Sequence, residues 1–201
     1  MKLRRLEMLL EQVRGYDRPD LAQEQYATPA PLAARLLFHA HGRGEIAGQR
    51  VCDPGCGTGI LACGAALLGA SAVVGIDIDP GAIERARANA DALGVEVTFL
   101  AADIRTWDPR DRFDTVVMNP PFGAQRAHAD RPFIDFALRH AEVIYAVFNA
   151  GSRDFVAAYI GDRGRIEEVI DARLRIPRTY AHHRREAQEI PVEIIRMCAS
   201  P

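Results

Sequence analysis

A short, rigid motif, Asn119-Pro120-Pro121-Phe122, follows the apolar run 113–118. Two consecutive prolines hold two φ angles near about −65° and remove two backbone donors, so the motif presents carbonyl oxygens rather than N–H groups. The side-chain oxygen of Asn119 and the carbonyl of Pro120 are a pair of acceptors, and Phe122 adds an aromatic face. This combination suits a planar group that carries an NH₂, such as an adenine base. The alternative is a rigid turn that only closes a strand.

The exocyclic amine of adenine is a weak nucleophile because its lone pair is delocalised into the ring. Acceptors for both of its hydrogens, at Asn119 and Pro120, favour a pyramidal nitrogen whose localised lone pair can attack a methyl group. Such catalysis depends on positioning and hydrogen bonding, with no metal and no strong base. Phe122 would stack on the base, which must be unstacked or flipped to reach the site. We therefore predict Asn119, Pro120, Pro121 and Phe122 to be the catalytic residues.

A glycine-rich turn, Gly55-x-Gly57-x-Gly59, connects a predicted strand to an apolar helix that begins at Ile60. In this context the turn predicts a ligand at the carboxyl ends of the strands. Dinucleotide folds normally have G-x-G-x-x-G and bind a pyrophosphate at the helix N-terminus. Here the spacing differs, and the carboxylate of Asp53 directly before the turn would repel phosphates. The pattern favours S-adenosylmethionine, which has a sulfonium and an ammonium group and no phosphate.

Two further acids follow the next predicted strands, Asp77 after the second and Asp103 after the third. We expect Asp77 to accept hydrogen bonds from both ribose hydroxyls of the cofactor, and Asp103 to accept from its adenine amine. Ile78 and Ile104, each adjacent to one of these acids, are expected to pack against the adenine ring. Two other interpretations compete with this one, a tight turn beside solvated acids and NAD as the ligand.

The spacing of apolar residues predicts strands that alternate with helices. Helices are expected near 3–13, 29–37, 60–68, 80–93, 134–142 and 154–160, and strands near 50–53, 72–77, 95–101, 114–118, 143–148, 165–174 and 189–197. Thr28 is expected to cap the second helix, with Pro29 at its first position. The alternation indicates a doubly wound α/β fold with an antiparallel pair at the C-terminal end.

The length of 201 residues suits one domain, and 48% hydrophobic and 26% charged residues are ordinary for a globular protein. No apolar stretch is long enough for a transmembrane helix, and the charged start of the chain is unlike a signal peptide, so we expect a cytoplasmic protein. The four cysteines form no CxxC pair, which favours reduced thiols and no metal site.

The formal net charge is −2, so nucleic-acid binding would require a local basic patch. One cluster combines cationic side chains with an aromatic residue, and it comprises Arg173, Arg175, Arg178, Tyr180, His182, His183, Arg184 and Arg185. We predict RNA contacts at Arg178, Tyr180, His183, Arg184 and Arg185. The alternative is a solvated charged surface.

Four segments together resemble the methyltransferase-like protein 5 family, and they are Gln25-Tyr26-Ala27-Thr28, Asp53-Pro54-Gly55-Cys56-Gly57-Thr58-Gly59, Gly75-Ile76-Asp77-Ile78-Asp79 and Val117-Met118-Asn119-Pro120-Pro121-Phe122-Gly123. The resemblance extends from about Glu24 to Arg196. Many amino-methyltransferases share the glycine turn and the Asn-Pro-Pro-Phe motif, whereas Gln-Tyr-x-Thr and the C-terminal Tyr with its basic residues narrow the choice. The chain departs from the family pattern at Pro54, where Leu is usual, and in the loop after Gly123.

The resemblance implies a class I S-adenosylmethionine-dependent methyltransferase that modifies an adenosine of small-subunit rRNA at its exocyclic amine. It implies a Rossmann-like fold, with a seven-stranded, mostly parallel sheet and helices on both faces. We expect a single domain over 1–201, with an N-terminal helical cap at 1–49 and the core at 50–201. By motif match the family's cofactor contacts fall on Gln25, Thr28, Gly55, Thr58, Ile60, Asp77, Asp103 and Ile104, and we add Tyr26, Asp53, Gly57 and Ile78.

A partner protein is also expected. In the usual strand order of this class, the strand near Val95–Phe99 lies at the edge of the sheet, where unpaired backbone groups can accept another strand. Relatives in the family use a small zinc-binding activator protein. We therefore expect such a partner to add a strand at this edge.

Other functions remain open at this point. A glutamine amide in a translation factor also presents an NH₂ beside a carbonyl, although enzymes that methylate it usually have Tyr in place of Phe122 and a separate substrate-binding domain. A DNA adenine methyltransferase generally needs a target-recognition domain, for which this chain has no room. A catalytically silent RNA-holding subunit would usually lack the Asn-Pro-Pro element or the glycine turn.

Overall fold

The computed structural model describes residues 1–16, 27–122, 128–176 and 188–200. Its helices are α1 (Leu3–Leu10), α2 (Ala30–Gly42), α3 (Ile60–Leu67), α4 (Pro80–Leu93), α5 (Arg131–His140) and α6 (Arg153–Ile160), and a short 3₁₀ turn follows at Gly161–Arg163. Its strands are β1 (Arg50–Pro54), β2 (Ala72–Asp77), β3 (Thr98–Ala101), β4 (Phe113–Met118), β5 (Ala141–Asn149), β6 (Gly164–Ile176) and β7 (Gln188–Ala199).

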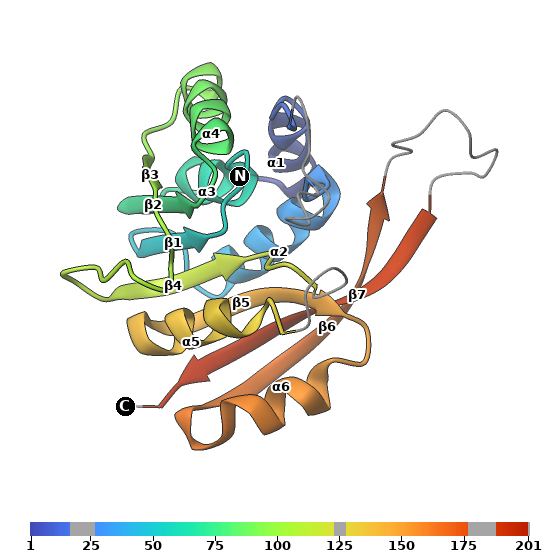
Figure 1. The fold of residues 1–201 in the computed structure, drawn as a ribbon. Coiled ribbons are helices and arrows are strands. Elements are labelled where there is room, and N and C mark those ends of the chain that lie inside the picture. Colours follow the sequence, from blue (N-terminus) through green and yellow to red (C-terminus); the bar gives the residue numbers. More distant parts are fainter. Residues whose placement is uncertain (17–26, 123–127, 177–187, 201) are drawn as a thin grey trace, which may run out of the picture.

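The strands form one seven-stranded sheet in the order β3-β2-β1-β4-β5-β7-β6. Strands β1 to β5 pair in parallel, whereas β7 runs antiparallel to both of its neighbours, β5 and β6. The predicted mostly parallel sheet and the antiparallel pair at its C-terminal end are confirmed (Figure 1). The strand order reverses between β1 and β4, and the carboxyl ends of strands at such a switch point are where open α/β sheets bind ligands.

Helices cover both faces of the sheet, α1 to α4 on one face and α5 and α6 on the other (Figure 1). Each face has its own buried apolar core, and neighbouring residues of β4 contribute to opposite cores. Val117 belongs to the core under α1 to α4, whereas Val116 and Met118 belong to the core under α5 and α6. This alternation follows from the two-residue period of a strand that is buried on both faces. Leu6 and Leu37, from α1 and α2, share the first core with the sheet.

Helices α2 and α3 approach each other closely at Gly64. A Cβ atom at this position would lie 2.3 Å from Cδ1 of Leu37. Leu37 is fully buried and also packs in the core. The glycine therefore permits the close packing of α2 on α3.

Strand β3 is shorter than expected, because residues 95–97 lie outside it. The N–H of Val95 donates to the carbonyl of Ala90, and Gly94 ends α4 with a φ of 66°. Because Gly94 ends α4 and Val95 still bonds to that helix, the strand begins only at Thr98. The position of β3 at the sheet edge agrees with the prediction. Helix α5 also lies earlier than the expected 134–142, because residues 141 and 142 already belong to β5.

Glu45, between α2 and β1, connects the N-terminal helices to distant strands. Its carboxylate accepts hydrogen bonds from the guanidinium of Arg196 on β7 and the hydroxyl of Tyr145 on β5. Its backbone carbonyl accepts a hydrogen bond from Thr115 on β4. Burial opposes ionisation of Glu45, but the hydrogen bonds from Arg196 and Tyr145 bring its pKa below the ordinary value. This charged network is largely buried, since Arg196 is only 6% exposed.

None of the helices in the described ranges is long and apolar enough to span a membrane. All four cysteines, which lie within these ranges, are free thiols. Among the described residues, histidine, cysteine and acidic side chains nowhere form a group of three or more that could hold a metal ion.

Candidate active site

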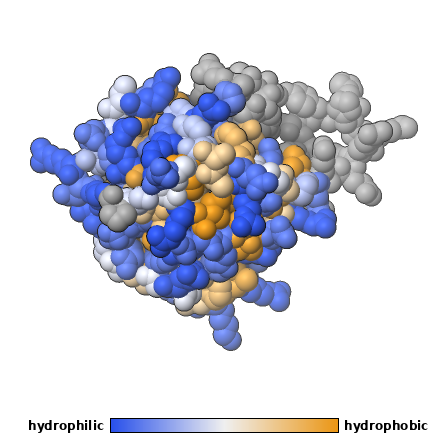
Figure 2. Space-filling view, turned by 90° about the horizontal axis from the view of Figure 1, so that it is seen from below, coloured by the Kyte–Doolittle hydropathy of each residue, from blue (hydrophilic) through white to orange (hydrophobic). Residues whose placement is uncertain are grey.

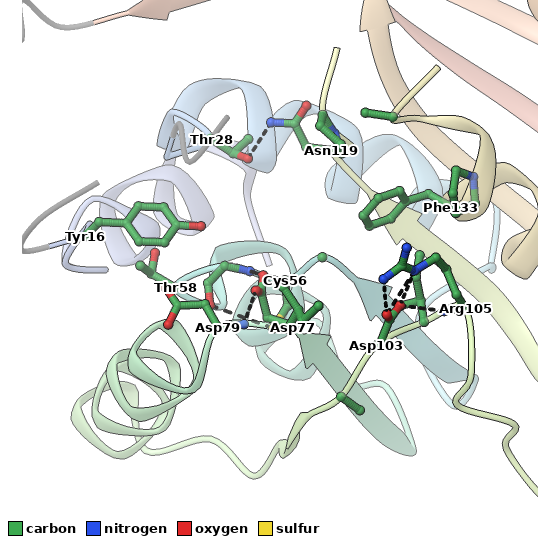
Figure 3. Close-up of a pocket in the computed structure, with 18 of the residues that line it drawn as sticks. Tyr16, Thr28, Cys56, Thr58, Asp77, Asp79, Asp103, Arg105, Asn119 and Phe133 are labelled. Carbon is green, nitrogen blue, oxygen red and sulfur yellow. Dashed lines mark hydrogen bonds and ion pairs between the residues drawn. The ribbon is translucent and has the colours of Figure 1, made fainter. Parts of the chain in front are cut away.

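A cavity of about 720 Å³ opens beyond the carboxyl ends of the parallel strands, a volume typical of small-molecule sites. Its wall includes the glycine turn and residues that follow β2, β3 and β4, namely Gly55, Cys56, Gly57, Thr58, Ile60, Asp77, Ile78, Asp103, Ile104, Asn119 and Pro121. The same cavity thus brings together the predicted cofactor half and part of the predicted reacting half (Figure 3).

The glycine turn uses several of its backbone amides within the protein. The N–H groups of Gly55 and Cys56 both donate to the carbonyl of Ile76, at 2.7 and 2.9 Å. The N–H of Gly57 donates to Oδ2 of Asp77 at 2.8 Å. Amides that are bonded in this way cannot bind the pyrophosphate of a dinucleotide, which needs free N–H groups at this position. The turn therefore suits a ligand without phosphate.

Two aromatic side chains approach the turn where only glycine fits. Gly57 has a φ of +52°, and a Cβ atom there would lie 2.2 Å from the hydroxyl oxygen of Tyr16. Gly55 has a φ of +72°, and its Cβ would lie 2.7 Å from the ring of Phe133. Left-handed backbone and close approach both require glycine. Tyr16 and Phe133 line the cavity, but the sequence analysis did not identify them, because no motif marks either residue.

The carboxylate of Asp77 accepts hydrogen bonds from two backbone amides and faces the cavity. One of its carboxylate oxygens accepts from the N–H of Gly57 and the other from the N–H of Asp79. Burial raises the pKa of Asp77, although these hydrogen bonds oppose the shift. Each oxygen can accept a second hydrogen bond, which the hydroxyls of a ribose could donate. The next residue, Ile78, is 57% exposed and offers apolar surface at the cavity to a planar ring.

Asp103 is already engaged by a cation (Figure 3). The guanidinium and the backbone N–H of Arg105 both donate to its carboxylate. These interactions lower the pKa of Asp103. The predicted hydrogen bond from an adenine amine would therefore share Asp103 with Arg105. Arg105 lines the cavity and was not identified from the sequence.

The structure does not place Asp53 on the cavity wall, so its predicted contact with the cofactor stays a prediction. Asp53 is 1% exposed and is not part of the cavity wall. Its Oδ2 accepts a hydrogen bond from the N–H of Ala62 in the first turn of α3. Burial raises its pKa to about 8, so the carboxyl group is mostly neutral at pH 7. Asp53 supports the start of α3, where helix amides lack partners of their own.

Asn119 is held by a side chain from the segment before α2. Its Nδ2 donates to Oγ1 of Thr28 at 2.9 Å (Figure 3). Its Oδ1 is buried and has no hydrogen-bond partner among the residues that the structure describes. A buried acceptor without a partner is costly, so such an atom indicates a place for a ligand donor. The expectation that Thr28 caps the second helix is wrong, because the N-cap is Pro29 and the helix has no side-chain cap.

The other residues of the motif occupy different environments. Pro121 lines the cavity, Pro120 is buried, and Phe122 packs against the core under α1 to α4. Phe122 is not among the residues that line the cavity, so its stacking on a base stays a prediction. Within the described residues, Phe133 and Tyr16 provide the aromatic surface of the cavity wall.

Several predicted site residues cannot be placed. They are Gln25, Tyr26, Arg178, Tyr180, His183, Arg184 and Arg185, all of which lie outside the described residues. Within the same basic cluster, the side chain of Arg173 is described, and its Nη1 forms an ion pair with Glu189 at 3.0 Å.

The described site fits S-adenosylmethionine. Asp77 offers acceptors to a ribose, Ile78 and Ile104 offer apolar surface to a purine ring, and the glycine turn does not require phosphate. A family model described as a methyltransferase domain matches residues 46–153. The crystal structure of a candidate RNA methyltransferase from Pyrococcus horikoshii matches with a TM-score of 0.91 and 32% identity, over 100% of this chain and 99% of that one. Fold and site together define a class I S-adenosylmethionine-dependent methyltransferase.

Relatives of full length narrow the class further. The rRNA N(6)-adenosine-methyltransferase Mettl5 of Drosophila melanogaster is 35% identical over 98% of this chain and 96% of its own length. A Methanocaldococcus jannaschii protein is 41% identical over 98% of this chain and 94% of its own length. The chain belongs to the methyltransferase-like protein 5 (METTL5) family, as the sequence motifs indicated.

Proposed function

We propose that this protein transfers a methyl group from S-adenosylmethionine to the exocyclic amine of an adenosine in RNA, with small-subunit rRNA as the substrate. The observation that carries the proposal is the amide of Asn119, whose nitrogen is held by Thr28 and whose buried oxygen has no partner in the described ranges of the chain. An amine hydrogen of adenine would supply the missing donor. Full-length relatives named rRNA N(6)-adenosine methyltransferases favour RNA over a glutamine side chain of a translation factor.

The residues of the chain would act by binding and orientation. When bound, S-adenosylmethionine supplies a methyl group on a sulfonium, which becomes a neutral thioether as the new C–N bond forms. Asp77 and Ile78 would hold the nucleoside part of the cofactor. Asn119 Oδ1 would accept one amine hydrogen and the Pro120 carbonyl the other, which localises the lone pair on nitrogen. After transfer, the methylated amine loses one proton to water.

Replacement of Asn119 tests this assignment. We expect Asn119→Ala to lower the rate of RNA methylation by a factor of about 10²–10³, as loss of an electrostatic contact to a reacting group commonly does. Binding of S-adenosylmethionine, measured by calorimetry, should change little. The assay uses labelled cofactor, a small-subunit rRNA transcript and nucleoside mapping of the product.

Asn149→Ala is the matched control, because Asn149 is an exposed amide at the end of the neighbouring strand β5. It should methylate at the wild-type rate. Equal rates for Asn119→Ala and wild type, or a product other than N6-methyladenosine, would contradict the proposal.

We also propose a partner, a small zinc-binding activator protein that adds a strand to β3. The support is the place of β3 at the end of the sheet, where within the described strands it pairs only with β2. Co-expression should raise both the melting temperature and the methylation rate. A protein whose stability and activity are indifferent to such a partner would refute this. Because ribosomal RNA is the proposed substrate, we expect the protein in the cytoplasm.

A further inference from the structure

An arginine lies over two aromatic rings next to the cavity. Arg131 is the first residue of α5, and the two residues that follow it, Pro132 and Phe133, line the cavity. Its guanidinium carbon is 5.9 Å from the ring centroid of Phe155 and 5.0 Å from that of Tyr159, both on α6. The two rings are stacked, with centroids 6.0 Å apart and an interplanar angle of 19°. We call Arg131, Phe155 and Tyr159 the α5–α6 face.

The charge of Arg131 is not neutralised within the described part of the chain, where it forms no ion pair, and its Nε is buried without a hydrogen-bond partner. A second arginine near Tyr159 differs. Arg163 lies 5.1 Å from the same ring, forms an ion pair with Asp135 at 2.6 Å and donates to the carbonyl of Tyr159. Asp135 also accepts from the hydroxyl of Tyr159. Arg163 thus completes a structural network, whereas Arg131 retains the capacity to bind an anion.

The apolar member of the face is open to solvent. Phe155 is 38% exposed, although large apolar side chains of this protein are mostly buried. Figure 2, which views the molecule from below, shows an apolar area among predominantly hydrophilic side chains. An exposed ring beside a guanidinium that has no ion pair within the described ranges matches what single-stranded RNA requires, namely a platform for a base and a contact for a phosphate.

The α5–α6 face also lies on the side of the molecule at which the cavity opens. Helices α5 and α6 follow the parallel strands β4 and β5, respectively, so their first turns lie near the carboxyl edge of the sheet, where the cavity opens. A net charge of −2 means that local groups must provide any attraction to RNA.

We propose that the α5–α6 face binds the RNA next to the target adenosine, with a backbone phosphate at the guanidinium of Arg131 and a flanking base on the ring of Phe155. This inference rests on the proposed function. It assigns RNA contacts to a part of the molecule far in sequence from the basic cluster at 173–185.

Binding of a fluorescently labelled single-stranded RNA with one adenosine, measured by anisotropy at several salt concentrations, tests the proposal. We expect Arg131→Gln to weaken binding about tenfold, which corresponds to the loss of one charge-assisted hydrogen bond. The slope of log affinity against log salt should fall by about 0.7, the value for one phosphate contact to a single strand. Phe155→Ala should weaken binding by a similar factor without a change of slope, because stacking releases no counterions.

Arg163→Gln is the matched control, since it removes a like charge that also lies over the ring of Tyr159, and it should leave affinity and slope unchanged. Arg131→Lys keeps the positive charge and should therefore keep the salt slope. This variant separates the loss of charge from any effect of the substitution on folding. Equal effects of Arg131→Gln and Arg163→Gln, or an unchanged slope in Arg131→Gln, would overturn the inference. Its failure is distinct from failure of the proposed function, because the wild-type protein would then still methylate RNA. A wild-type protein that methylates no RNA would overturn both.

Discussion

The amide of Asn119 is restrained by one neighbour, and the restraint decides which of its atoms is left for a ligand. Thr28 Oγ1 accepts from Nδ2, so Oδ1 is the atom without a partner in the part of the chain that the structure describes. An acceptor for a weakly nucleophilic amine has to be held in place before the substrate arrives. Thr28 therefore acts on the reaction through Asn119, in addition to lining the cavity.

Replacement of Thr28 by valine removes the hydroxyl and keeps the shape. We expect Thr28→Val to lower kcat about tenfold, because the amide loses the hydrogen bond that orients it. The KM for S-adenosylmethionine should change much less than kcat, and Thr28→Ser should restore most of the turnover. Steady-state kinetics with varied cofactor provide both values. If cofactor binding weakened as strongly as kcat fell, Thr28 would act mainly on the cofactor.

Some residues that the sequence motifs singled out line the cavity, whereas other residues of its wall were missed for identifiable reasons. Asp77 and Asp103 line the cavity because each lies at or just after the end of a strand, and strand ends can be predicted from apolar periodicity. The burial of Asp53 and the packing of Phe122 depend on side chains from distant elements, which a motif does not encode. Phe133 was missed for the same reason, since its contact with Gly55 arises only when α5 packs beside the turn.

At the scale of elements, the helices could be predicted more accurately than their contacts. The limits of α4 and β2 agree with the expected 80–93 and 72–77 because proline, glycine and acidic residues mark their ends. The close packing of α2 on α3 was not predicted, because a glycine inside an apolar helix pattern has no single interpretation. In the structure Gly64 is the residue that allows this packing.

Alanine at Gly64 tests the importance of the α2–α3 contact. The added Cβ would lie 2.3 Å from a fully buried side chain, Leu37, which cannot move away easily. We expect Gly64→Ala to lower the free energy of unfolding by about 1–3 kcal/mol despite the better helix propensity of alanine. Urea denaturation measures the difference.

Gly42→Ala is the control for this comparison, because Gly42 ends α2 and, outside its own helical turn and chain neighbours, no described atom lies within 4 Å of the point that a Cβ would occupy there. This variant should be as stable as the wild type or slightly more stable. Similar losses at both positions would show that the close contact is not the cause.

For the molecule as a whole, the buried Asp53 should make stability depend on pH. Its pKa is about 8 in the folded protein against an ordinary value of 3.8, so between these pH values the folded state holds a proton that the unfolded state releases. The unfolded state binds fewer protons there, and the free energy of unfolding contributed by this group therefore falls as the pH rises.

Asp53→Asn removes this titration and keeps the shape of the side chain. We expect the variant to gain stability relative to the wild type as the pH rises from about 4 to about 8. The gain should approach about 1.4 kcal/mol per pH unit at most, which is the free energy of one proton. Urea denaturation of both proteins at several pH values measures it. A difference that does not vary with pH would show that Asp53 ionises alike in both states.

The position of β7 has a consequence for how the chain assembles. β7 follows β6 in sequence but lies between β5 and β6 in the sheet. A nascent polypeptide that has been synthesised only as far as residue 187 thus has no neighbour in place for β6, and the outer side of β5 stays open. Until β7 is inserted, Glu45 also lacks the guanidinium of Arg196. The native architecture can be completed only when a late segment enters its interior, so slow translation near this point would prolong the exposure of two aggregation-prone borders.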